Sequence, residues 1–169
     1  MTRLPIPTLL VLIIVLANSV GCVDENCLPS SSPSVTLGQG VGGAFAEIMD
    51  GQQVSLTPAP QGGQGVPVII RTQGLAASNS ALADVQLDTL VEGQLAGSFL
   101  LEEARLLCRG DGEGGEISGT VVGFDPDQYQ NNDDFIELNG REVGLDVTVY
   151  DEEDGTATIL QLVTLIVGG

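Results

Sequence analysis

Apolar and polar residues alternate along most of the chain with a period of two, as they do in a β-strand that buries one face. The clearest case is the segment 143–150, where four apolar positions alternate with more polar ones. An acidic turn at 151–155 follows, and the β-branched stretch 156–167 returns the chain. Because β-branched residues favour strands, this pattern predicts a hairpin whose second strand lies in the core.

The segment 82–90 alternates in the same way, with Asp84, Gln86 and Asp88 on its polar face. Two further strands are predicted at 53–57 and 66–71. Pro67 limits the second of these to a sheet edge or a strand start, because proline has no N–H to donate to a neighbouring strand. Turn-forming residues separate the predicted strands at 50–51, 58–65, 77–80, 110–115 and 139–140.

The segment 98–108 fits two structures. It carries apolar residues at helical spacing, with good helix formers between them, at Leu100, Leu101, Ala104 and Leu107. The surrounding strand pattern favours a pair of strands with a short helical turn instead. Both interpretations are kept at this point.

Short strands separated by turns at this spacing predict an all-β fold, a sandwich of about seven or eight strands. The sandwich domain is predicted over residues 35–169. Residues 22–34 are rich in Ser and Pro and have little apolar content, so they predict a flexible tether.

One stretch of this domain, residues 35–75, also carries a resemblance. It contains the motif Leu37-Gly38-Gln39-Gly40, the turn Asp50-Gly51 and the loop Pro60-Gln61-Gly62-Gly63. In this it resembles a group of lipid-anchored bacterial envelope proteins with an immunoglobulin-like domain. The chain departs from that group at Ala59, where Gly is usual, and at Gln64-Gly65, where a His commonly follows the loop. The resemblance implies an immunoglobulin-like antiparallel β-sandwich and an envelope location, and it implies no activity.

The N-terminus is typical of an export signal. Arg3 precedes an unbroken apolar run from Leu9 to Ala17, which is shorter than the roughly 20 residues of a membrane-spanning helix. The run leads to Val20-Gly21-Cys22, which resembles the lipobox of bacterial lipoproteins, although Ser19 stands where Leu is usual. The resemblance implies a signal peptide over residues 1–21 and a lipid on Cys22.

The lipobox resemblance also implies a location. Val23, rather than Asp, follows the modified cysteine, and in this family that favours the outer membrane. The alternative is ordinary cleavage after Ser19 or Gly21, which would give a soluble secreted protein.

The number of cysteines agrees with a lipid on Cys22. If Cys22 carries the lipid, Cys27 and Cys108 remain, and an oxidising compartment allows them to pair. Such a bridge closes a loop of about 80 residues, for which chain entropy gives roughly 4–5 kcal/mol. The alternative is two buried free thiols.

Composition excludes several classes of function. The chain has 169 residues, a formal net charge of −18, no His and no Trp, and all five basic residues are arginines. Without His or Lys it cannot build a Ser-His-Asp triad, a Schiff base or a Walker A loop. Its negative charge would repel nucleic acid. The sequence therefore predicts a non-catalytic protein that does not bind nucleic acid.

Two acidic segments are candidate calcium sites. The segment 125–134 has an Asp-x-Asp start, but it lacks the Gly and Glu that an EF-hand requires. A looser calcium site would use Asp125, Asp127, Asp133 and Asp134. Calcium shared between this loop and the acidic turn 151–154 is a further possibility. No other cofactor is predicted.

The sequence thus predicts a lipid-anchored envelope protein that presents an acidic sandwich domain as a structural or interaction module. Its partners would be the membrane, through the anchor, and a protein or surface polymer that the sequence does not identify. Two alternatives are a calcium-dependent binding module for such a partner and a carboxylate-based hydrolase.

Overall fold

The computed structural model describes Cys27 and residues 32–40, 44–60 and 62–168. These residues form eleven strands and one short helix. In chain order they are β1 (Ser34–Gln39), β2 (Ala46–Glu47), β3 (Gln52–Ser55), β4 (Thr57–Pro58), β5 (Gln64–Gln73), β6 (Leu82–Val91), β7 (Gln94–Arg105), β8 (Leu107–Cys108), β9 (Gly115–Gly123), α1 (Asn132–Ile136), β10 (Glu142–Asp151) and β11 (Thr156–Ile166).

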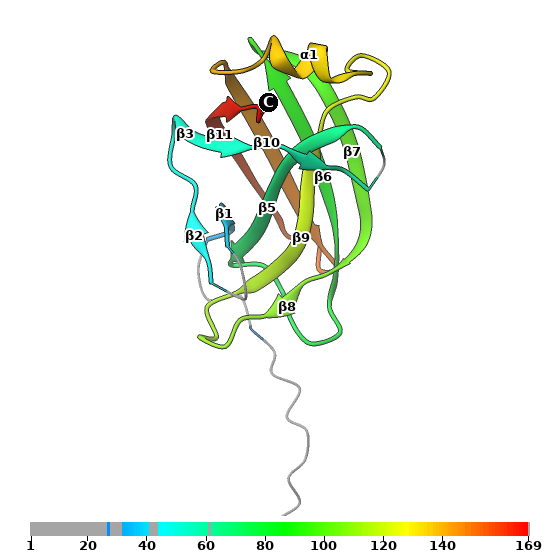
Figure 1. The fold of residues 1–169 in the computed structure, drawn as a ribbon. Helices are drawn as coiled ribbons and strands as arrows, with labels where there is room; N and C mark the ends of the chain where they lie inside the picture. Colours follow the sequence, from blue (N-terminus) through cyan, green and yellow to red (C-terminus); the bar gives the residue numbers. More distant parts are fainter. Residues whose placement is uncertain (1–26, 28–31, 41–43, 61, 169) are drawn as a thin grey trace, which may run out of the picture.

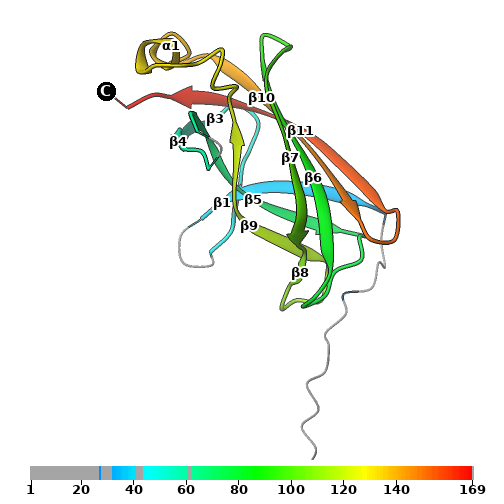
Figure 2. The ribbon, with the colours of Figure 1, turned by 90° about the vertical axis from the view of Figure 1, so that its right-hand side faces the viewer.

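The strands form two sheets that pack face to face (Figure 1; Figure 2). The first sheet has the order β2-β1-β5-β9-β8, with β4 beside β5, and the second has the order β3-β11-β10-β6-β7. In the lettering of immunoglobulin domains, these are the sheets ABED and GFCC′. The predicted all-β, immunoglobulin-like sandwich is therefore confirmed.

One pairing differs from the predicted antiparallel arrangement. β3 pairs with the last strand, β11, in parallel, through the register from Gln52↔Val163 to Ser55↔Ile166. The predicted strand 53–57 is accordingly split, because β3 belongs to the second sheet and β4 to the first. A short run of alternating residues does not reveal that the chain changes sheets within it.

Aliphatic side chains from the inner faces of both sheets form the core. The alternation in the sequence identified these faces correctly in β6, where Val85, Leu87 and Thr89 are buried, and in the predicted C-terminal hairpin. The largest fully buried side chains of the described residues are Phe124, Leu37, Ile48, Ile70, Leu75, Leu87, Leu106, Leu145 and Leu165.

The segment 98–108 is extended and contains no helical turn. It forms most of β7 and then β8, which pairs with β9 in the other sheet. A bulge opposite Asp84 places two β7 residues, Glu102 and Glu103, where a regular strand would have one, and Glu103 has a positive φ of 54°. The bulge changes the inward spacing of β7 from two residues to three, which explains the helix-like pattern.

Pro67 lies in β5, an inner strand, between β1 and β9. On the β1 side, however, β1 pairs only as far as Ile69, and β4 pairs only with Gln64 and Gly65. Pro67 therefore occupies a gap in the sheet where no neighbouring strand needs its missing N–H.

The helix α1 covers one end of the sandwich, opposite β8 (Figure 1; Figure 2). Its Phe135 is buried against Phe124 and Tyr129, with ring centroids 5.6 and 5.7 Å away. Burial raises the pKa of the Tyr129 phenol. This aromatic cluster holds a helix that would be too short to form alone in water.

The turn between β6 and β7 provides a stability test. Glu92 and Gly93 connect paired residues Val91 and Gln94 and have φ values of 53° and 75°, as in a type I′ turn that favours Asn-Gly. We expect Glu92→Asn to raise the free energy of unfolding by about 0.5–1 kcal/mol, measured by urea denaturation. Glu92→Gln, which also removes the exposed ion pair to Arg141, should give no gain. A loss in Glu92→Asn equal to that of Glu92→Gln would contradict the turn assignment.

Candidate functional site

The solvent-facing side of the second sheet, called here the outer face, combines apolar side chains with carboxylates. Exposed Leu95 and Leu100 of β7, Tyr150 of β10 and Leu160 of β11 contribute to it. The leucines lie in β7 and β11, on either side of β6 and β10, and Tyr150 lies between them in β10. A sheet face that carries several large apolar side chains is typical of an interaction surface. The outer face is therefore the first candidate for a binding surface.

A depression of about 380 Å³ lies at the α1 end of the outer face. Leu90, Leu160 and Leu162 line it together with Gly144, which has no side chain to fill it. A Cβ atom at Gly144 would lie 3.1 Å from Leu160 and 3.3 Å from Leu90. The exposed ion pair between Arg141 and Glu92, 3.0 Å long, closes one side.

Two aspartates lie next to this depression. Asp88 of β6 and Asp146 of β10 are directly opposite each other in the antiparallel register, and Leu160 of β11 is opposite Asp146 on the other side. Gln86 donates to Asp88 Oδ1 at 2.6 Å and to Ser98 Oγ at 2.9 Å. Burial, together with the negative charge of Asp88, raises the pKa of Asp146. Like charges in this position destabilise a sheet.

The aspartate pair can attract a cation. A basic side chain placed between the two carboxylates would relieve their repulsion, and the leucines beside them would contact its apolar neighbours. Acid–base hydrolysis needs a substrate cleft between two carboxyl groups, and neither aspartate lines the depression beside them. At the sheet surface, the two carboxylates can bind a cationic group.

Sequence analysis placed Asp88 on a polar face, and Asp146 is one of the more polar positions of the segment 143–150, but it did not identify them as a pair. Both residues were visible in the alternation. Their pairing depends on the register between β6 and β10, which are more than 50 residues apart, and one sequence contains no signal for that register.

The four predicted calcium ligands lie in separate hydrogen-bonding arrangements. Asp125 accepts from the backbone N–H of Asp127 at 2.8 Å. Asp134 accepts from the backbone N–H of Asn131 at 3.1 Å in the capping box that starts α1, and Asp133 donates its own N–H to the Asn131 side chain. Within the described residues, no group of three or more acidic or cysteine side chains is placed to hold a metal ion.

The other acidic segment lies at the far end of the sandwich. β10 begins just after α1 and ends at Asp151, ten residues later, which is about 30 Å of strand. Calcium shared between the 125–134 loop and the 151–154 turn is therefore wrong. Asp151 has a structural role instead, since its carboxylate accepts from Gly155 at 2.6 Å within the turn and from Ala76 at 2.7 Å.

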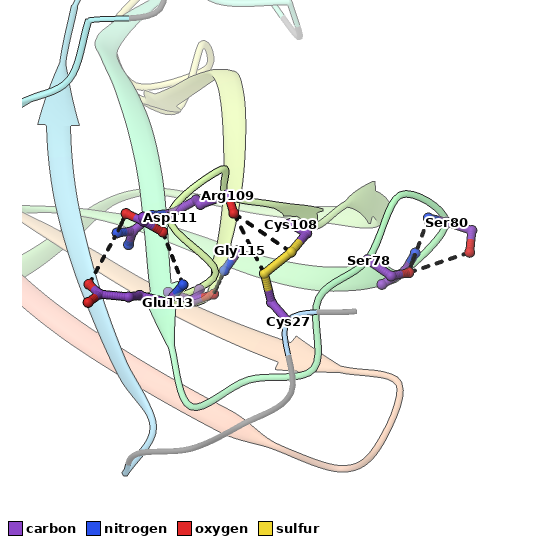
Figure 3. The surroundings of a disulfide bond; sticks show 10 residues. Cys27, Ser78, Ser80, Cys108, Arg109, Asp111, Glu113 and Gly115 are labelled. Atoms are coloured by element: carbon purple, nitrogen blue, oxygen red, sulfur yellow. Dashed lines mark hydrogen bonds and ion pairs between the residues drawn. A yellow bond between two sulfur atoms is a disulfide. The ribbon is translucent and has the colours of Figure 1, made fainter. Parts of the chain in front are cut away.

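The predicted disulfide joins Cys27 to Cys108, with their Cα atoms 5.5 Å apart (Figure 3). Cys27 is buried, and its backbone pairs with Ala77 through an N–H···O bond of 2.9 Å. Gly115, opposite Cys108, permits this close packing, because a Cβ atom there would overlap Leu106 and Ala77. The disulfide thus fastens the N-terminal segment to the end of the sandwich opposite α1.

The structure describes only part of the region for which a signal peptide, a lipid anchor and a tether are predicted. Cys22 and the predicted signal peptide, residues 1–21, lie outside the described residues. Of the predicted tether 22–34, Cys27 is bound into the domain and Ser34 is the first residue of β1. No helix in the described part of the chain is long and apolar enough to cross a membrane.

Comparisons with known proteins add no assignment. No family model matches the chain, and no curated protein sequence is significantly similar to it. The geometry of the outer face and of the disulfide is therefore the basis for a functional proposal.

The aspartate pair gives a pH-dependent prediction. Because the pKa of Asp146 is raised on folding, its ionised form destabilises the folded state at neutral pH, and this penalty disappears as the pH falls through the raised pKa. Asp146→Asn should therefore increase the free energy of unfolding at pH 7 by about 0.5–1 kcal/mol. The gain should be absent near about pH 3, below the ordinary Asp pKa.

Thermal melting at both pH values measures this effect. Glu47→Gln, which removes one exposed negative charge from β2, is the matched control and should change the melting temperature little. An equal gain for Asp146→Asn at both pH values would show that charge repulsion between Asp88 and Asp146 is not its cause.

Proposed function

We propose that this protein is a lipid-anchored component of the bacterial cell envelope that acts as a non-catalytic interaction module. The observation that carries the proposal is the Cys27–Cys108 disulfide, which fastens the segment just after Cys22 to the folded domain. Structural disulfides are typical of exported proteins. The lipobox-like Val20-Gly21-Cys22 and the envelope-protein resemblance of the segment 35–75 support the same assignment.

The disulfide would also fix the distance between domain and membrane. Cys27 is five positions after Cys22, so the two cysteines lie at most about 18 Å apart. A lipid on Cys22 would therefore hold the disulfide end of the sandwich close to the bilayer. Val23 after the anchor favours the outer membrane.

Negative charge at that end would act against its direct contact with the bilayer. The β8–β9 loop brings Asp111 and Glu113 beside the disulfide, where Arg109 pairs with both of them (Figure 3). The β10–β11 turn adds three more acids at 152–154, so the net charge of these groups is negative. Anionic lipid head groups repel such a surface. The outer face would then stand away from the membrane and be free for a partner.

The outer face suits a partner that presents a basic side chain between apolar ones. Asp88 and Asp146 would pair with the cation, and Leu160 and Leu100 would contact the flanking apolar groups. The net charge of −18 would speed the approach of such a partner.

The anchor is tested by Cys22→Ser. The wild-type protein, recovered from membranes, should have the mass of a chain that begins at Cys22 with acyl groups attached, and Cys22→Ser should lose both the acyl mass and the membrane association. Cys108→Ser is the control, because it removes the disulfide but leaves the anchor residue. Recovery of the wild-type chain in the soluble fraction with an unmodified mass would show that the protein is secreted and carries no lipid anchor.

The outer face is tested with two peptides, acetyl-Leu-Arg-Leu-amide and acetyl-Leu-Gln-Leu-amide, in an NMR titration. We expect the arginine peptide to shift the amide resonances of Asp88, Asp146 and Leu160 saturably at millimolar concentration, and the glutamine peptide to do so much less. Asp146→Asn should weaken the response, while Glu47→Gln should not. Equal responses to both peptides would exclude the carboxylate pair as the recognition element.

A further inference from the structure

The register of three neighbouring strands arranges the outer face in rows that cross β6, β10 and β11. The acidic row holds Asp88 and Asp146, with Leu160 beside them. The next row toward α1, called here the apolar row, consists of Leu90, Gly144 and Leu162. Alternate residues of a strand lie about 7 Å apart on one face. An acidic contact site and an apolar one are therefore separated by about 7 Å.

The rows on the two sides of the aspartates differ in chemistry. Away from α1, the row that follows the acidic row consists of Gln86, Thr148 and Thr158. The two threonine hydroxyls lie 2.9 Å apart, within hydrogen-bond distance, and Gln86 donates to Asp88. Within these three strands, a ligand at the aspartates finds apolar contact on the α1 side and polar groups on the other side.

The apolar row contains the depression of about 380 Å³ at Gly144. Leu90 and Leu162 flank Gly144 and are half-buried, so a ligand can reach their side chains from solvent. The ion pair between Arg141 and Glu92 closes one side. The depression has room for one large aliphatic side chain, and filling it would remove the apolar surface of these leucines from water.

The width of the depression favours an extended chain as its occupant. Leu90 and Leu162 belong to β6 and β11, which lie on either side of β10 and are therefore about 10 Å apart. A helix with its side chains is about 10–12 Å wide, so it would rest on the two leucines. An extended chain is about half as wide and can enter between them.

We propose that the partner of the outer face is an extended peptide segment in which a basic residue lies two positions from a large aliphatic residue. The basic side chain lies between Asp88 and Asp146, and the aliphatic side chain fills the depression at Gly144. Side chains two positions apart in an extended chain lie on one face at the same spacing of about 7 Å. The inference rests on the proposed function, because it takes the binding of a cation by the two aspartates as given and adds a second contact.

Peptides of identical composition test the spacing. Acetyl-Thr-Leu-Thr-Arg-Thr-amide and its reversed sequence place leucine and arginine on the same side of an extended chain, which threonine favours. Acetyl-Thr-Thr-Leu-Arg-Thr-amide places them on opposite sides. In an NMR titration of the purified Cys22→Ser chain, the tighter of the two spaced peptides should bind about fivefold more tightly than the adjacent one. It should shift the amide resonances of Leu90 and Gly144 as well as that of Asp146.

Filling the depression tests the location. The wild-type side chains should bind the spaced leucine peptide about fivefold more tightly than the same peptide with alanine in place of leucine. Gly144→Val should bind the two peptides equally, because its side chain occupies the depression. In Gly144→Ala, the new Cβ atom would lie 3.1 Å from Leu160 and 3.3 Å from Leu90, and the preference should be reduced. This smaller change provides the test if Gly144→Val does not fold.

Gly110→Val is the matched control for these variants. Gly110 lies in the β8–β9 loop, at the other end of the sandwich, and a Cβ atom there would have no other atom within 4 Å. The Gly110→Val protein should therefore keep the full preference for leucine over alanine. Thermal melting of each variant shows whether it is folded.

The outcomes separate this inference from the proposed function. Equal affinity for the spaced and adjacent peptides, or an unchanged preference for leucine in Gly144→Val, would overturn the contact at Gly144, while arginine-dependent binding would still support the aspartate pair. A spaced peptide with glutamine in place of arginine should bind much less. Equal binding of the arginine and glutamine forms, or no saturable binding of either spaced peptide at millimolar concentration, would overturn both proposals.

Discussion

The packing of the two inner sheet faces against each other is the constraint on which the rest of this structure depends. Alternate residues of β5, β6, β10 and β11 are aliphatic and buried in one shared core. Because side chains alternate along a strand, burying one set leaves the other set in solvent, including Asp88 and Asp146. The core also explains why the chain tolerates a gap in the first sheet: Val66 and Val68 stay buried there without a neighbouring strand on that side.

The two ends of the sandwich differ in how they are closed. At one end, an aromatic cluster around Phe135 holds the short helix α1, and Asp134 completes the capping box that Asn131 begins. At the other end, the disulfide binds the N-terminal segment to β8, and Asp151 links the β10–β11 turn to Ala76. The disulfide, the burial of Cys27 and its backbone pairing with Ala77 together join the N-terminal segment, in which few apolar residues precede β1 between residues 22 and 34.

The outer face places two carboxylates among its leucines, which suits the cationic partner proposed above. Its two aspartates repel each other, so their ionised state is unfavourable until a cation lies between them.

The local sequence was enough to predict the strands β6, β10 and β11 and their buried faces, because the alternation of apolar and polar residues shows which side chains of a strand are buried. It also carried the Cys27–Cys108 pairing, since only two cysteines remained once Cys22 was assigned to the lipid. It failed at 98–108, where the bulge at Glu103 imitates helical spacing, and at Glu92-Gly93, whose turn lacks the usual Asn. The aspartate pair and the parallel β3–β11 pairing arise from register and strand order, which contacts between distant segments decide. The alternation of a single strand contains no record of which strand lies beside it.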